Sequence, residues 1–144
     1  MRGINAGRVL LGGLAAGLLV NLVEFLVNTF WLGQAWTHAL AGIGVTVQPG
    51  LGGAVPLVLW AFLIGITAVW IYAAVRPRFG AGPLTAIRAG LVTWVLGYLS
   101  GALAAMPMGV FPIWLLGAST LVGLPEVIMA TLAGAFIYRE AVSA

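Results

Sequence analysis

The sequence contains no cysteine, no lysine and no aspartate, and its charged residues are six arginines and three glutamates. Without cysteine, the chain has no disulfides, thiol redox chemistry or Cys-ligated clusters. A single histidine, His38, rules out a bis-histidine haem site within one chain. The positive charge balance does not indicate nucleic-acid binding, because the arginines are few and do not form a clustered basic face. The sequence therefore predicts no cofactor.

Polar residues are too scarce to cover a water-soluble domain. Hydrophobic residues make up 62% of the 144 residues, and charged residues only 6%. A soluble domain carries about 25% charged residues. This composition predicts an all-α integral membrane protein, whose outer surface is solvated by lipid.

Four apolar segments are long enough to cross a bilayer, which takes about 20 helical residues. They cover approximately residues 9–32, 54–75, 84–106 and 113–138, and stretches rich in proline and glycine separate them. The first segment runs well past the length of a signal-peptide core and no convincing small-x-small cleavage site follows it, so we expect it to be retained. We expect one membrane domain over residues 1–144, a bundle of four helices. The outer loop, residues 33–53, could begin with a short helix lying on the membrane surface.

The arginines predict the orientation of the bundle. With four spans, all six arginines fall on the same side, and the two opposite loops contain no arginine. The positive-inside rule then puts both chain termini in the cytoplasm. The segment "RPRFGAGP" is a topogenic turn in this interpretation, and its arginines could also bind anionic lipid headgroups. The topogenic or headgroup-binding residues are Arg2, Arg8, Arg76, Arg78, Arg88 and Arg139.

A polar stripe interrupts the first span. Asn21, Glu24 and Asn28 are spaced i, i+3, i+7, so they share one face of a helix, extended by Trp31. A charged side chain at the centre of a membrane helix costs about 2.5–3.5 kcal/mol on insertion scales. The stripe is therefore expected to face other helices or a hydrated cavity. Gly13 and Gly17, on the same face, form a GxxxG pattern that lets a neighbouring backbone approach closely.

The third and fourth segments offer surfaces that match this stripe. Trp94 and Tyr98 lie one turn apart in the third segment, and Glu126 follows Pro125 in the fourth. Because no arginine lies at the same depth, we expect at least one of the two buried glutamates to be protonated. The candidate polar or proton site comprises Asn21, Glu24, Asn28, Trp94, Tyr98 and Glu126. The candidate helix-packing glycines are Gly13, Gly17, Gly90, Gly97, Gly101 and Gly123.

Two functional interpretations stay open for this stripe. In the first, the polar groups only hold helices together, and the chain is a small inner-membrane protein with an accessory, assembly or packing role. In the second, Glu24 and Glu126 form the site of a proton-coupled transporter for a small molecule or an ion, since ionisable residues inside membranes often mark transport pathways. The expected partners are the lipid bilayer and either a second copy of the chain or another membrane protein.

No specific pattern supports an enzyme or a metal site. The sequence has no nucleophile–base pair, phosphate-binding loop or dinucleotide fingerprint. Two glutamates, with or without His38, could ligate a metal, but the Glu-x-x-His pair that would make such a site specific is absent. We therefore interpret His38 as a residue of the outer interfacial loop.

Two resemblances to known families bear on these interpretations. The stretch "WIYAAVRPRFGAGPLTAIRAGL" (70–91), together with "NLVEFLVN" (21–28), resembles small uncharacterised bacterial membrane proteins with four helices. This resemblance implies a four-span protein of the inner membrane and no particular activity. The stretch "LVEFLVNT" is similar to the first helix of the small multidrug resistance transporters, where a glutamate is followed five residues later by a threonine. That similarity implies that Glu24 binds protons and substrate.

The chain departs from the transporter pattern in several places. It is longer, it has a long outer loop, and it carries a second glutamate, Glu126, in the fourth span. Its one-sided arginines also oppose the dual topology that some of those transporters use.

Overall fold

The computed structural model describes residues 3–47 and 50–139, and this part of the chain is helical without strands. Arg2 lies outside the described residues. The main helices are α1 (Ala6–Val27), α2 (Gly33–Gly42), α3 (Leu51–Phe79), α4 (Pro83–Trp94), α5 (Ser100–Ala105) and α6 (Ile113–Ile137). Two π-helical segments, η1 (Asn28–Leu32) and η2 (Val95–Leu99), join α1 to α2 and α4 to α5, and a short 3₁₀ turn, η3 (Met106–Met108), follows α5.

The structure confirms an all-α fold with four helices long and apolar enough to cross a membrane. These continuous helical stretches are Ala6–Gly42, Leu51–Phe79, Pro83–Met108 and Ile113–Ile137. Large apolar side chains cover their outer surface, including Phe136, which is 91% exposed, and Phe30, which is 79% exposed. Such a surface matches lipid rather than water.

Two helices are longer than the sequence indicates. The first span continues through η1 into α2, so the outer loop begins with ten helical residues. The second span starts at Leu51 and includes Pro77 in its last turn. A proline removes one backbone donor but is compatible with helical φ, and the helix ends only at Gly80, whose φ of 82° lies in the left-handed region.

Small residues bring α1, α3 and α6 into close contact. A Cβ at Gly13 would lie 2.6 Å from the Cα of Ile66 in α3, and one at Gly12 would lie 2.6 Å from the carbonyl oxygen of Gly134 in α6. A Cβ at Gly65 would lie 2.6 Å from the Gly13 carbonyl oxygen. The backbones therefore touch where these helices cross, and α4 packs against both α6 and α3.

Two tyrosines hold the helix ends together on one side of the bundle. The Tyr138 hydroxyl, just after α6, accepts a hydrogen bond from the Asn5 amide before α1 at 3.3 Å. The Tyr72 hydroxyl in α3 accepts one from the Gly82 amide at 3.4 Å. The two rings meet edge to face with centroids 6.0 Å apart, and Arg76 stacks on Tyr138. The start of α1, the end of α3, the α3–α4 turn and the end of α6 are thus joined.

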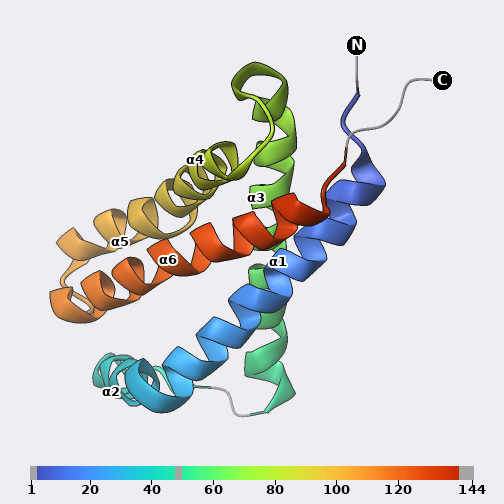
Figure 1. Cartoon of the computed structure of the whole chain (residues 1–144). Helices are drawn as coiled ribbons and strands as arrows, with labels where there is room; N and C mark the ends of the chain where they lie inside the picture. Colours follow the sequence, from blue (N-terminus) through green and yellow to red (C-terminus); the bar gives the residue numbers. More distant parts are fainter. Residues whose placement is uncertain (1–2, 48–49, 140–144) are drawn as a thin grey trace.

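The bundle opens at its other end. Figure 1 shows α5 and the first half of α6 leaning away from the first half of α3, while α2 lies beside the end of α1. Near this end, α3 contacts the third span through the ring pair Trp60–Tyr98, with centroids 5.3 Å apart, and through Ile64 against Gly97. The candidate site lies at this level, where the helices begin to diverge.

Candidate functional site

Glu126 is the most enclosed charged residue in the described part of the chain. It lies in α6, and only 1% of its surface is exposed. Its Oε2 accepts a hydrogen bond from the Tyr98 hydroxyl at 3.2 Å, which links α6 to η2. Its Oε1 is buried and has no hydrogen-bond partner among the described residues. One carboxyl oxygen is therefore satisfied and the other is left to bind a proton or a ligand.

Glu24 approaches the same region from α1 and is only half-buried. The Asn28 side-chain amide donates to its Oε2 at 2.8 Å and to its backbone carbonyl at 2.9 Å. Glu24, Tyr98 and Glu126 are near enough for their charges to interact. In the described part of the chain, the side chain that binds the Glu24 carboxyl group is Asn28 and the one that binds Glu126 is Tyr98. Two carboxyl groups therefore lie in one region, each bound by an uncharged side chain.

Each glutamate is bound by a side chain from a π-helical segment. Asn28 is the first residue of η1, and Tyr98 lies in η2. A π-helical turn inside an α-helix costs regular hydrogen bonding and is frequently found at functional sites. Both irregular segments lie where a polar side chain is directed at a carboxyl group.

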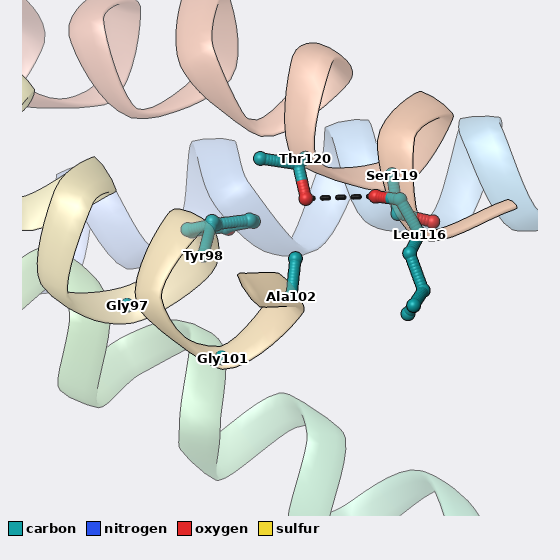
Figure 2. Close-up of a pocket in the computed structure, with 7 residues that line it drawn as sticks. All are labelled: Gly97, Tyr98, Gly101, Ala102, Leu116, Ser119 and Thr120. Atoms are coloured by element: carbon teal, nitrogen blue, oxygen red, sulfur yellow. Dashed lines mark hydrogen bonds between the residues drawn. The ribbon is translucent and has the colours of Figure 1, made fainter. Parts of the chain in front are cut away.

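Two cavities flank Ser119 of α6. The larger, about 240 Å³, lies between α6 and the η2–α5 segment (Figure 2). The smaller cavity, about 20 Å³, lies between α1, α2 and α6, and Glu24 is one of the residues that line it. The larger is lined by Gly97, Tyr98, Gly101, Ala102, Leu116, Ser119 and Thr120, and the smaller by Glu24, Val27, Asn28, Leu32, Trp36, Ser119 and Val122.

Asn21 and Trp94 bind backbone carbonyls rather than the glutamates. The Asn21 side-chain amide donates to Gly17 of its own helix at 2.9 Å and to Val58 of α3 at 3.4 Å. The Trp94 indole donates to the Thr120 carbonyl at 2.8 Å and so ties α4 to α6. Of the six predicted polar residues, the structure brings Glu24, Asn28, Tyr98 and Glu126 together and leaves the other two in interhelical contacts.

The predicted packing glycines differ in their surroundings. At four of them, a Cβ would closely approach a neighbouring helix; these are Gly13 and Gly17 against α3, Gly90 against α6 and Gly123 against the Tyr98 ring. Gly97 meets only the end of the Ile64 side chain, and no described atom lies within 4 Å of a Cβ at Gly101. Gly97 and Gly101 line the larger cavity instead.

The described arginines lie on the elements that meet at the tyrosine-linked end of the bundle. Arg8, Arg78, Arg88 and Arg139 are exposed, and Arg88 also stacks on Phe79. His38 is exposed on α2, and within residues 3–47 and 50–139 no three His, Cys, Asp or Glu side chains gather as a metal site would require.

Three neighbours of the site were not predicted from the sequence. Ser119 lines both cavities, Trp60 packs on Tyr98, and Trp36 borders the smaller cavity and meets Phe111 edge to face at 5.4 Å. Ser119 precedes Glu126 by two helical turns, so helical spacing already places both on one face of the fourth span, although Ser119 is not among the six predicted polar residues. The two tryptophans belong to other helices, and nothing in the local sequence marks them as neighbours.

Comparison of the chain with protein-family models, with curated proteins and with solved structures finds no match. What this chain does is therefore inferred from the geometry of its site.

Proposed function

We propose that this chain is a multi-pass protein of the bacterial inner membrane that exchanges protons at Glu24 and Glu126, as the coupling site of a transporter for a small molecule or an ion. The observation that carries the proposal is Glu126: a fully enclosed carboxyl group with one oxygen bound by Tyr98 and the other without a partner. Ionisable residues inside membrane bundles are typical of proton relays and substrate pathways.

A purely structural role explains this arrangement less well than a proton site does. Polar groups that only hold helices together are stable when every donor and acceptor is satisfied, and an unsatisfied buried group costs about 1–3 kcal/mol. Glu126 retains such a group beside a second carboxyl and a cavity of about 240 Å³. A site that takes up a proton or a ligand during its working cycle explains why the fold tolerates it.

The arginine distribution supports the orientation in this proposal. Arg8, Arg78, Arg88 and Arg139 belong to the elements that Tyr72 and Tyr138 join, and the helices open at the opposite end. Under the positive-inside rule, the arginine-bearing end faces the cytoplasm. The cavities would then face the periplasmic half of the membrane.

The test is infrared spectroscopy of the purified protein in lipid bilayers. The carboxyl C=O band is followed between about pH 5 and pH 9 in the wild type, Glu24→Gln and Glu126→Gln. We expect the wild-type band to change with pH. Each variant should lack the part of this change that comes from the glutamate it replaces. Glu140→Gln, which alters the one glutamate outside the described residues, is the matched control and should leave the response intact. A wild-type band that does not respond to pH contradicts the proposal.

An assembly role is the second candidate, favoured by Gly97 and Gly101. Both are exposed, and Gly101 has no described atom within 4 Å of its Cβ position, so a helix of another chain could approach this surface. The molecular mass in detergent or nanodiscs, compared between the wild type and Gly101→Leu, tests this role. A mass equal to one chain in the wild type contradicts self-assembly.

A further inference from the structure

Ser119 separates the two cavities and lines both of them. Its Oγ is buried and has no hydrogen-bond partner among the described residues. The neighbouring hydroxyl, Thr120 Oγ1, instead donates to the Leu116 carbonyl at 2.7 Å, and Figure 2 shows this bond beside the larger cavity. Among the α6 residues that line these cavities, Ser119 therefore has a hydroxyl group that can bind a ligand from either cavity.

The smaller cavity has the size and lining of a site for a single water molecule. A water molecule needs at least about 10–15 Å³ of cavity volume and two to four polar partners. The cavity volume is about 20 Å³, and its polar lining residues are Glu24, Asn28 and Ser119. Both hydrogens of the Asn28 side-chain amide are already donated to Glu24. A bound water can donate to the Asn28 Oδ1 and to a Glu24 carboxyl oxygen and accept from the Ser119 hydroxyl, so this set can satisfy one molecule.

We propose that the smaller cavity binds one water molecule and that Ser119 relays protons between it and water in the larger cavity, which joins Glu24 to the Tyr98–Glu126 pair. The larger cavity supplies the second part of this route, because Tyr98 lines it and donates to Glu126 Oε2. The two glutamates then act as one proton-exchanging unit. This inference rests on the proposed function, since it requires that the carboxyl groups change protonation.

Each step of the relay conserves protons. Glu24 gives its carboxyl proton to the water in the smaller cavity, and that water passes one of its own protons to Ser119 Oγ. Ser119 releases its original hydroxyl proton to water in the larger cavity. The Tyr98 hydroxyl accepts a proton from that water and donates its own proton to Glu126 Oε2. At each relaying oxygen one O–H bond forms and one breaks, while Glu24 loses one O–H bond and Glu126 gains one. The net result is transfer of a proton from Glu24 to Glu126.

The test is a pH jump followed by time-resolved infrared spectroscopy of the full chain in lipid bilayers, with the two carboxyl bands assigned from Glu24→Gln and Glu126→Gln. In the wild type we expect both bands to relax with one rate constant. In Ser119→Ala we expect the rate constants to separate by at least about tenfold, because removal of a proton-transfer group typically costs more than that. Ser100→Ala is the matched control: Ser100 is exposed and donates to its own helix at Leu96, so its loss should leave one rate constant.

Val122→Ile tests the water directly. Val122 lines the smaller cavity, and one additional methylene would take up much of its volume of about 20 Å³ without removing a polar group. We expect this variant to separate the rate constants as Ser119→Ala does, and it remains informative if Ser119→Ala does not fold.

The possible results distinguish the inference from the proposed function. One rate constant in both Ser119→Ala and Val122→Ile overturns the relay, while the proposed function stands. Separated rate constants in Ser119→Ala alone overturn the water site. If neither carboxyl band responds to the pH jump in the wild type, the proposed function fails and the relay fails with it.

Discussion

The ring of Tyr98 lies against the backbone of Gly123, in the space that the Cβ of any larger residue would occupy. That Cβ would lie 2.5 Å from the ring Cε1 atom. Tyr98 is thereby held where its hydroxyl reaches Glu126, three residues further along α6. The glycine positions a residue that binds the buried carboxyl group.

Gly123→Ala is expected to displace the Tyr98 ring and weaken its hydrogen bond to Glu126. Overpacking of this kind costs about 1–3 kcal/mol, so the free energy of unfolding in detergent should fall by that amount. Gly117→Ala in the same helix is the matched control, since no described atom lies within 4 Å of its Cβ position. Replacing a helical glycine with alanine in open space should be neutral or stabilising by up to about 1 kcal/mol. Equal effects of the two substitutions would contradict this role of Gly123.

Gly65→Ala is expected to separate α1 from α3. Its Cβ would lie 2.6 Å from the Gly13 carbonyl oxygen and 2.7 Å from the Gly17 Cα, and neither backbone atom can move away by changing a rotamer. We expect a loss of at least about 1–3 kcal/mol in the free energy of unfolding. Gly101→Ala should be tolerated, because its surroundings are open. Measured unfolding free energies that do not differ between the two variants would show that the contact between α1 and α3 is looser than the structure has it.

Tyr98→Phe keeps the ring on Gly123 but removes the donor to Glu126 Oε2, so that neither carboxyl oxygen is bound by a described residue. The loss of one partner of a buried carboxyl should cost about 1–3 kcal/mol of stability and shift the infrared C=O band of Glu126. Tyr72→Phe is the comparison: the Tyr72 hydroxyl only accepts a 3.4 Å bond from Gly82, and the Glu126 band should not move. An unchanged band in Tyr98→Phe would mean that the two side chains do not bind each other in the membrane.

The absence of native cysteine makes the proposed orientation simple to test. Thr37→Cys places a thiol on the exposed face of α2, and Ala81→Cys places one in the exposed turn between α3 and α4. In intact bacterial spheroplasts, a membrane-impermeant maleimide should label the first thiol, and in inverted vesicles the second. Labelling of Ala81→Cys from outside the cell would reverse the orientation.

Helical periodicity predicted one part of the polar stripe and failed beyond it. Up to Val27 the helix is a regular α-helix. A repeat of 3.6 residues places Gly13, Gly17 and Glu24 toward the bundle, and the two glycines do contact α3. From Asn28 the chain is π-helical, each turn holds more residues, and the face rotates. Trp31, expected on the polar face, is 61% exposed. The residue spacing does not predict the change from α-helix to π-helix at Asn28, because it assumes a constant repeat of 3.6 residues.

Neighbouring helices explain the remaining differences. Tyr98 and Glu126 were expected to belong to one polar site, and the structure joins them because η2 packs directly on α6. Gly101 was expected to pack against a helix, but α5 diverges from α3 and the residue lines a cavity instead. Composition and spacing indicate how deep a residue lies in a bundle, whereas its partner depends on which helices are adjacent and how closely small residues let them approach.

Because the tyrosines hold the helices together at one end of the bundle, a small tilt there moves the other end of each helix by a larger distance. Tyr138 fixes one end of α6, and the helix begins 25 residues away, at Ile113. At 1.5 Å per residue, a tilt of about 5° around Tyr138 moves the far end of α6 by about 3 Å. Ser119 lies near that far end, so a small rotation at the arginine-bearing side would widen or close the space around it by roughly the diameter of a water molecule.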